Sequence, residues 1–205
     1  MFIVDFDDVL LDTMAYKESR IIALEKIGVT REVYNATYKQ TYYNYTHEAH
    51  ALALAEHEFS YDTVLHVLNE CLHAVGQFIF SDTHDFLDFL KSYKEKIILL
   101  TIGISEIQEF KVDAAGIRKY FDEIVTTIEP KEKVILELNS EIKNNSWFFE
   151  DKVKETLSVR RAFPQLNIVL RQGSHIPEIE YEQSGLPYFK TLTEIKNYVR
   201  EQYAK

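Results

Sequence analysis

Six short apolar runs, separated by segments of helical periodicity, constrain the fold of this sequence more than any other feature. The runs cover residues 2–4, 97–100, 124–125, 147–149, 168–170 and 188–189. From residue 81 onward, the segments between them carry apolar residues three and four positions apart, as in DTHDFLDFLKSY and VKETLSVRRAF. Short apolar runs that alternate with helices are typical of a parallel sheet that is covered on both faces. The sequence therefore predicts an α/β fold.

The stretch from residue 14 to residue 80 interrupts this alternation. It carries helical periodicity and turn signals but no convincing strand pattern. A helix that contains Ile21, Leu24 and Ile27 is expected to stop at Gly28, because glycine readily adopts the left-handed conformation that ends helices. We therefore predict an α/β core formed by residues 1–13 and 81–205, with residues 14–80 inserted as a helical cap.

The charge and composition of the chain exclude several classes of protein. Its 205 residues include 33 acidic and 23 basic ones, and the net charge of −10 would repel nucleic acid and anionic membranes. No apolar run approaches the roughly 20 residues of a membrane-spanning helix. Cys71 is the single cysteine and allows no internal disulfide. We therefore expect a cytoplasmic protein that binds neither nucleic acid nor membrane.

Polar residues stand at the ends of the first four predicted strands. In an open parallel sheet, ligands bind beyond the carboxyl ends of the strands, so these residues are the candidates for a functional site. In chain order they are Asp5, Asp7 and Asp8, then Thr101, then Lys131 and Lys133, and finally Glu150 and Asp151.

Asp5 and Asp7 are two residues apart and point to the same side of an extended chain, whereas Asp8 points away. Two carboxylates about 5 Å apart repel by roughly 3 kcal/mol at an effective dielectric constant of about 20. A divalent cation or a retained proton would relieve that repulsion, and both suit an active site. A carboxylate, a hydroxyl and an ammonium group that converge with Mg²⁺ also match the needs of a transferring phosphoryl group.

The order and spacing of these residues resemble the four motifs of the haloacid dehalogenase (HAD) superfamily. Those motifs are a strand ending in Asp-x-Asp, a strand ending in Thr, a later Lys, and a strand ending in an acidic pair. The resemblance covers nearly the whole chain and includes FSDTHDFLDFLKSYKEKIILLT, EFKVDAAGIRKYFDEIVTT and FFEDKVKETLSVRRAFP. It implies a Rossmann-like parallel sheet with helices on both faces and an inserted helical cap.

The resemblance also implies a role for the strand-end residues. Asp5 would be the nucleophile that becomes a phosphoaspartate, and Asp7 would protonate the leaving group and then activate water. Thr101 and Lys131 would bind and neutralise the phosphoryl oxygens. Lys133 is the alternative candidate for the lysine of the third motif, although Lys131 matches the family position better.

Mg²⁺ is the cofactor that the resemblance implies. Asp151 would bind it together with Asp5 and the backbone carbonyl of Asp7, and Glu150 or Glu155 would complete the acidic motif. Family members with a cap at this position mostly act on small soluble phosphate esters, and dehalogenases of the family lack the second aspartate. The resemblance therefore implies a Mg²⁺-dependent phosphatase that acts on a small phosphorylated metabolite through an aspartyl-phosphate.

Two other functions stay open at this point. A phosphomutase of the same superfamily shares every motif and differs in whether water or a substrate hydroxyl accepts the phosphoryl group. A non-catalytic protein that binds a phosphate ligand on the same fold is the second alternative. Its basis is that Ile102 and Glu155 depart from the residues usual in the family.

Several other polar and aromatic residues are interpreted as structural. Asp12 is expected to cap the N-terminus of a helix, and Asp8 is expected to take no part in chemistry. Three histidines share one predicted helix, namely His47, His50 and His57. No regular ligand set accompanies them, which favours a solvated helix face over a zinc site. The tyrosine-rich segment 34–45 favours aromatic packing between cap helices over the lining of a substrate pocket.

Overall fold

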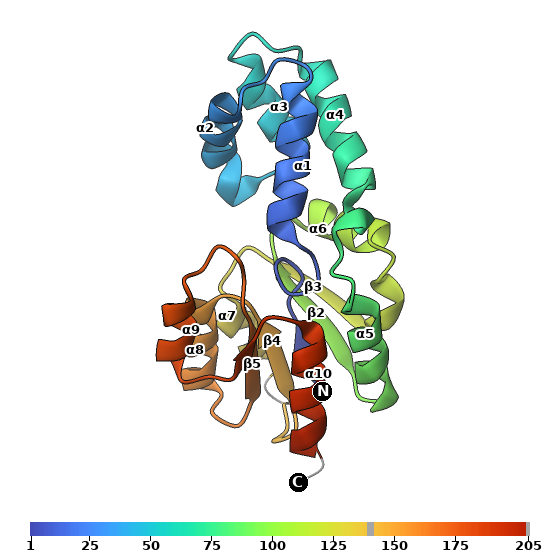
Figure 1. The fold of residues 1–205 in the computed structure, drawn as a ribbon, viewed down its shortest axis with the longest axis vertical. Coiled ribbons are helices and arrows are strands. Elements are labelled where there is room, and N and C mark those ends of the chain that lie inside the picture. The colour runs from blue at the N-terminus through green and yellow to red at the C-terminus, as the bar shows by residue number, and fades with distance from the viewer. Residues whose placement is uncertain (139–141, 204–205) are drawn as a thin grey trace.

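A six-stranded parallel sheet forms the centre of the computed structural model, which describes residues 1–138 and 142–203 (Figure 1). The strands follow the spatial order β3-β2-β1-β4-β5-β6. They are β1 (Phe2–Val4), β2 (Ile97–Ile102), β3 (Glu123–Thr127), β4 (Trp147–Glu150), β5 (Asn167–Arg171) and β6 (Tyr188–Phe189). Each of the six apolar runs forms a strand, so the predicted parallel α/β sheet is confirmed.

The order of the strands brings the predicted site residues to one edge of the sheet. β1 lies between β2 and β4 and pairs in parallel with both, so that Val4 is level with Leu99 and with Phe149. The chain first adds β2 and β3 on one side of β1 and then adds β4, β5 and β6 on the other side. The strand order therefore reverses at β1, and open α/β sheets bind ligands beyond the carboxyl ends of the strands at such a point.

Helices cover both faces of the sheet. They are α5 (Thr83–Ser92), α6 (Ser105–Ala114), α7 (Lys131–Glu137), α8 (Val153–Ala162), α9 (Glu178–Ser184) and α10 (Leu192–Tyr203), with the short 3₁₀ helix η3 (Arg118–Tyr120). Phe2 and Val4 join a buried cluster that includes residues of α5 and α10, whereas Ile3 joins a cluster with residues of α7, α8 and α9. Both faces are covered because successive strand residues point to opposite sides.

None of the helices in the described part of the chain combines the length and the apolar character that crossing a membrane requires.

Four further helices lie beyond the carboxyl ends of the strands, in the upper half of Figure 1. These cap helices are α1 (Thr13–Glu25), α2 (Arg31–Thr41), α3 (His47–Ala55) and α4 (Tyr61–His73), with the 3₁₀ helices η1 (Tyr42–Asn44) and η2 (Val75–Phe78). They share a buried cluster of their own, which includes Leu24, Tyr34, Leu54 and Leu68. This separate cluster supports the division into a core and a cap, whose boundaries at residues 13 and 81 stay a prediction.

Local sequence signals explain how the cap helices begin and end. The Asp12 side chain accepts a hydrogen bond from the backbone N–H of Ala15, which confirms the predicted N-cap of α1. Thr30, Thr46 and Ser60 cap the next three helices in the same way. α1 ends at Glu25, three residues before Gly28, where φ is +93° and the chain turns toward α2.

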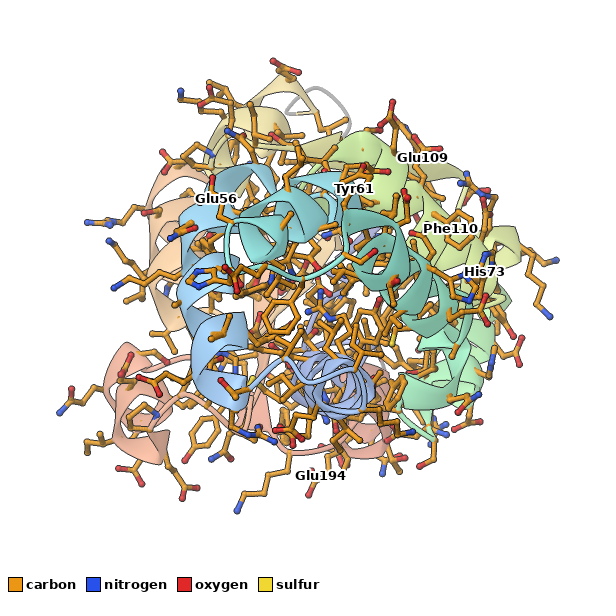
Figure 2. All side chains as sticks on the ribbon, turned by 90° about the horizontal axis from the view of Figure 1, so that it is seen from above. Glu56, Tyr61, His73, Glu109, Phe110 and Glu194 are labelled. Atoms are coloured by element: carbon orange, nitrogen blue, oxygen red, sulfur yellow. The ribbon has the colours of Figure 1, made fainter. Side chains whose placement is uncertain are left out.

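The cap helices are tied to the core at their two chain crossings and along α6. The backbone N–H of Asp12 donates to the carbonyl of Phe78 (2.8 Å), and that of Phe80 donates to the carbonyl of Leu10 (3.1 Å). Farther along, the rings of His73 on α4 and Phe110 on α6 meet edge to face at 5.0 Å, and Figure 2 shows them side by side. These contacts hold the cap helices over the strand ends.

Candidate active site

Asp5, Lys131 and Glu150 form the buried floor of the site. Asp5 directly follows β1, Glu150 is the last residue of β4, and Lys131 is the first residue of α7. The Lys131 ammonium lies 2.6 Å from Oδ1 of Asp5 and 2.5 Å from Oε2 of Glu150. All three side chains are buried, so one ammonium group forms ion pairs with two carboxylates out of contact with solvent.

Asp151 adds a third carboxylate to this floor. Ligand oxygens of Asp5, Glu150 and Asp151 lie within 4.8 Å of one another. Asp151 is fully buried, and neither of its carboxylate oxygens has a hydrogen-bond partner among the described residues. A buried carboxylate without a partner is costly, so a cation is the natural complement of this group. Three carboxylates that offer only oxygen atoms fit Mg²⁺.

The pKa values of these carboxyl groups reflect the excess of negative charge. Burial, followed by repulsion from Glu150, raises the pKa of Asp5 to about 8 and that of Asp151 to about 10. Burial also acts to raise the pKa of Glu150, but the Lys131 ammonium outweighs it and lowers that pKa to about 2. One lysine therefore neutralises one of the three carboxylates well and leaves the other two in need of positive charge.

Asp7 lies beside a second lysine, on the side of the site that faces the cap. Its Oδ1 is 2.5 Å from the ammonium of Lys111, and its Oδ2 accepts a hydrogen bond from Nε2 of Gln108 (2.9 Å). The hydroxyl of Thr13 donates to Oδ1 as well (3.2 Å). Burial acts to raise the pKa of Asp7, but Lys111 and Gln108 outweigh it and lower that pKa below its usual value. Asp7 therefore has an ammonium group of its own, whereas Asp5 shares that of Lys131 with Glu150.

Lys111 and Gln108 are not among the residues predicted from the sequence. Both lie on α6, and both side chains are buried. The signal that points to them is their spacing of three residues in the helix that follows β2, because such residues share one helix face. Which face turns toward the strand ends depends on how the helix packs, and the sequence does not show that.

Thr101 and Gly103 connect α6 to the end of β2. Gln108 donates from Nε2 to the Thr101 hydroxyl (3.2 Å) and to the carbonyl of Ile102 (2.7 Å), in addition to Asp7. Gly103 has φ +151°, and its backbone N–H donates to the carbonyl of Thr127 (2.8 Å). A Cβ atom at Gly103 would lie 2.8 Å from Nε2 of Gln108, so the loop needs a residue without a side chain.

The alternatives within the lysine and acidic motifs are placed differently in the structure. Lys133 is 68% exposed and pairs with Glu129, so Lys131 is the lysine that reaches the strand ends. Glu155, in the first turn of α8, is not part of the three-carboxylate group, although its Oε2 is buried without a partner among the described residues. Glu150 is therefore the acidic residue that accompanies Asp151.

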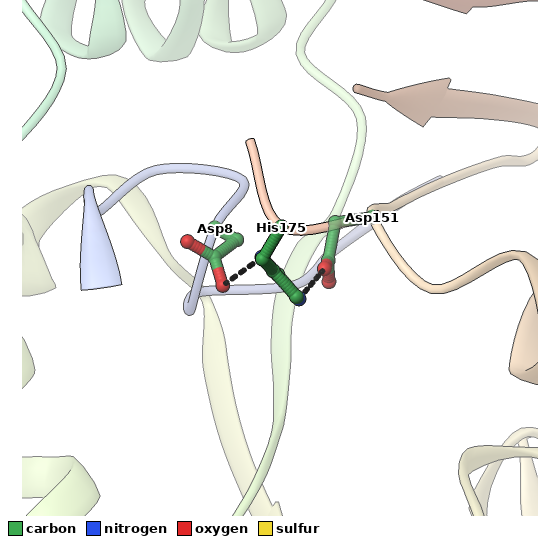
Figure 3. A group of neighbouring side chains, drawn as sticks. All are labelled: Asp8, Asp151 and His175. Carbon is green, nitrogen blue, oxygen red and sulfur yellow. Dashed lines mark ion pairs between the residues drawn. The ribbon is translucent and has the colours of Figure 1, made fainter. Parts of the chain in front are cut away.

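His175 lies between the carboxylates of Asp8 and Asp151, as Figure 3 shows. Asp8 has φ +60°, a left-handed conformation that aspartate tolerates better than most residues, and its carbonyl accepts a hydrogen bond from Arg171 (2.9 Å). His175 lies 3.7 Å from the Asp8 carboxylate through Nδ1 and 4.0 Å from that of Asp151 through Nε2. Sequence reasoning did not single out His175, which lies in the loop after β5.

A cavity of about 300 Å³ separates the strand ends from the cap helices. Asp7, Gln108 and Lys111 line it from the core. From the cap it is lined by Tyr16, Arg20, Tyr38, Tyr42, Tyr45 and His47. The tyrosine-rich segment therefore lines the cavity as well as packing between the cap helices, where the rings of Tyr34 and Tyr38 stack at 5.8 Å.

The prediction of a solvated helix face for the three histidines is wrong for two of them. His47 and His50 are 1% and 0% exposed, because α3 packs against both α2 and α4. His47 pairs through Nδ1 with the Asn69 side chain (2.8 Å), and His50 pairs through Nε2 with the Thr37 hydroxyl (3.0 Å). Only His57 is exposed, and no group of potential metal ligands in the described residues includes any of the three.

The fold and the strand-end site define a protein with a parallel α/β core and a buried acidic centre that contains one lysine. A family model of haloacid dehalogenase-like hydrolases matches residues 1–162, and the chain belongs to that family.

Solved structures with the same fold span almost the whole chain. A haloacid dehalogenase-like hydrolase from Burkholderia xenovorans has a TM-score of 0.73 at 17% identity, over 96% of this chain and 94% of its own. A candidate β-phosphoglucomutase from Thermotoga maritima has a TM-score of 0.69 at 19% identity, over 98% of both chains. The candidate HAD-hydrolase YfnB from Bacillus subtilis, solved with magnesium, has a TM-score of 0.68 at 14% identity, over 97% of both chains. The comparison with functionally curated proteins gives no match.

Proposed function

We propose that the protein is a Mg²⁺-dependent phosphatase that hydrolyses a small phosphomonoester through an aspartyl-phosphate. The observation that carries this proposal is the arrangement of the two aspartates at the end of β1. Asp5 lies on the buried floor against Lys131, and Asp7 lines the cavity, where it contacts Lys111 and Gln108. One carboxylate is thus held in place, and the other faces the space that a leaving group would occupy.

The two aspartates divide the chemistry between them. Before the first step Asp7 takes up a proton from solvent, because the approaching dianionic phosphoryl group raises its pKa against the effect of Lys111. An Asp5 oxygen then attacks phosphorus, the bond from phosphorus to the ester oxygen breaks, and the leaving oxygen takes that proton from Asp7. Asp7, now ionised, removes a proton from water, whose oxygen attacks phosphorus and releases phosphate and free Asp5. Lys131 and Thr101 bind the phosphoryl oxygens during both steps. Lys111 contributes by stabilising the ionised form of Asp7 between the steps.

Asp5, Glu150 and Asp151, with the backbone carbonyl of Asp7, would hold Mg²⁺. When bound, the ion supplies charge neutralisation, which lets a dianionic phosphate approach a cluster of carboxylates. The unpartnered oxygens of Asp151 and the purely oxygen ligand set support this choice of metal.

A phosphomutase is the second candidate, and the T. maritima structure named as a candidate β-phosphoglucomutase supports it. It would use the same residues and pass the phosphoryl group from Asp5 to a second substrate hydroxyl. A phosphomutase would move phosphoryl groups between hydroxyls with little net release of phosphate, whereas a phosphatase releases one phosphate per ester consumed.

Release of phosphate from p-nitrophenyl phosphate, with Mg²⁺ and with EDTA, tests the proposal. We expect activity that depends on added Mg²⁺ and a rise in melting temperature when Mg²⁺ is added to the metal-free protein. Asp151→Asn should weaken both effects, and Glu155→Gln should weaken them less, because Glu155 is outside the carboxylate group. Full activity in excess EDTA, with no metal found by elemental analysis, would refute the proposal.

A further inference from the structure

Arg20 is buried in the cap helices and surrounded by tyrosine rings. It lies on α1 and is only 4% exposed. Its guanidinium group is 4.8 Å from the ring centre of Tyr16, 5.5 Å from that of Tyr38 and 5.2 Å from that of Tyr45. One of its nitrogens donates a hydrogen bond to the Tyr45 hydroxyl (2.7 Å). The positive charge is thus held by aromatic faces and a phenol oxygen.

No carboxylate in the described part of the chain forms an ion pair with Arg20, and its Nε has no hydrogen-bond partner. The hydroxyl of Tyr16, beside it, has no partner either. Buried arginines are normally paired with a carboxylate, because burying a charge alone is costly. Two unused hydrogen-bond donors next to an unpaired positive charge therefore point to a missing anion.

Arg20 and Tyr16 line the same cavity as Asp7. Carboxylates balance the charges of the other two strong cations along its wall: Lys111 contacts Asp7, and the charges of Asp5 and Glu150 outweigh burial and raise the pKa of Lys152. Among the described residues that line the cavity, Arg20 alone contributes a positive charge that no carboxylate of the described chain balances. It does so on the cap side of the cavity, opposite the groups that would act on the phosphoryl group.

A hydrogen-bonded chain fixes the orientation of this site. The Tyr45 hydroxyl accepts from Arg20 and lies 3.3 Å from Nδ1 of His50, whose Nε2 is 3.0 Å from the Thr37 hydroxyl. Thr37 in turn donates to the carbonyl of Val33 within α2 (2.9 Å). These hydrogen bonds order the side chains before a ligand binds. Binding would therefore cost little side-chain entropy, as in a preorganised site.

We propose that Arg20, with the Tyr16 hydroxyl, binds a second anionic group on the substrate, at the end opposite to the phosphoryl group. This inference rests on the proposed phosphatase function and narrows its substrate class to small organic phosphates that carry a second acid. The cavity of about 300 Å³ limits the substrate to a compact molecule, for which a carboxylate is the smallest anion that fits a guanidinium fork. The tyrosine rings exclude water from the ion pair and so strengthen it.

Three matched compounds test this assignment: 2-carboxyethyl phosphate, its neutral amide, and ethanediol bisphosphate. For the wild-type protein we expect kcat/KM for the carboxylate to exceed that for the amide by about tenfold or more, as expected for a charged hydrogen bond. If Arg20 binds a carboxylate, kcat/KM for the bisphosphate should be lower than that for the carboxylate; a higher value would show that the site binds a phosphate instead. In Arg20→Gln the ratio of acid to amide should fall to within about threefold, because the neutral side chain cannot discriminate by charge.

Two further variants and a binding measurement make this test decisive. Lys17→Gln is the matched control: Lys17 also lies on α1, 4.7 Å from the Tyr38 ring, but it does not line the cavity, so the ratio should persist. Tyr45→Phe removes the hydrogen bond to Arg20 and should lower the ratio of acid to amide. It therefore tests the site independently if Arg20→Gln does not fold. Calorimetric titration of Asp5→Asn with the same three compounds measures the preference without turnover.

The outcomes separate this inference from the proposed function. Equal use and equal binding of acid and amide by the wild-type protein, or a ratio that Arg20→Gln preserves, would overturn the anion site. Tighter binding of the acid without release of phosphate from any compound would overturn the phosphatase and leave the anion site standing.

Discussion

The two lysine–aspartate pairs at the end of β1 are alike in chemistry and different in setting. In the pair of Asp5 and Lys131 the side chains are 4% and 1% exposed, and Glu150 shares the ammonium group. In the pair of Asp7 and Lys111 they are 25% and 9% exposed, and the carboxylate lines the cavity. In the proposed mechanism the more buried carboxylate attacks and the one on the cavity wall exchanges protons, so burial, more than the choice of partner, separates the two roles.

Replacing Asp5 should produce the largest loss of activity. Asp5→Asn is nearly isosteric but removes the attacking oxygen, so phosphate release should fall at least about a thousandfold. Asp8→Asn is the matched control, because Asn tolerates the left-handed backbone at that position and Asp8 is expected to take no part in chemistry. Circular dichroism should show both variants folded. Activity near the wild-type level in Asp5→Asn would refute the mechanism.

Lys131 and Lys133 should differ sharply although only one residue separates them. Lys131→Ala leaves two buried carboxylates without their ammonium partner, which should cost about 3–5 kcal/mol of unfolding free energy and orders of magnitude in kcat/KM. Lys133 is 68% exposed, so Lys133→Ala should change either quantity little. Urea denaturation and steady-state kinetics measure both effects. The reverse pattern would overturn the assignment of the lysine motif.

Loss of Lys111 should have a smaller effect than loss of Lys131. Lys111→Met removes the ammonium from a partly exposed pair, so water can replace part of the interaction, and kcat/KM should fall by about ten- to a hundredfold. Lys119→Met, at an exposed position after α6, serves as the control. A loss as large as that of Lys131→Ala would show that the two pairs are equivalent and that their difference in burial has no consequence.

The smallest effect concerns stability in acid and extends the comparison to the cap. Burial, followed by the charge of Arg20, lowers the pKa of His50 from 6.5 to about 3. Between these values the unfolded chain binds a proton that the folded chain does not, so stability falls as the pH drops below 6.5. At pH 5 the contribution of His50 to this loss should be about 2 kcal/mol relative to neutral pH.

Denaturation of the wild-type protein, His50→Gln and His57→Gln between pH 5 and 7.5 measures this effect. His50→Gln should flatten the dependence on pH, whereas the exposed His57 should be replaceable without changing it. An unchanged slope in His50→Gln would assign the acid sensitivity to another group.

The parts of the site that the sequence predicts are those that the topology of the sheet controls. Asp5, Thr101, Glu150 and Asp151 end adjacent parallel strands, and strand register alone brings them together. The family model confirms the expected family, and the parallel sheet confirms the expected fold.

Most of the parts that sequence reasoning missed lie on helices. Gln108, Lys111 and Arg20 contribute through helix faces whose direction depends on packing angles between elements far apart in the chain. The histidines of α3 show the same limit, because a short run of alanine and leucine does not indicate that a helix is buried on two sides. The exposed edge of the site, where His175 lies, belongs to a loop with no periodicity to interpret.

Gly103 restricts the mutational routes by which this site can evolve. The amide of Gln108 lies where a side chain at Gly103 would begin, and that amide donates at once to Asp7, Thr101 and the Ile102 carbonyl. A flexible side chain would normally yield to a new methyl group, but this one is fixed at three points. A change to alanine or serine at Gly103 would therefore disturb the cavity-facing aspartate and the strand-end threonine together. Substitutions in the cap helices can therefore change the lining of the cavity with less disturbance of the strand-end contacts than substitutions in this loop.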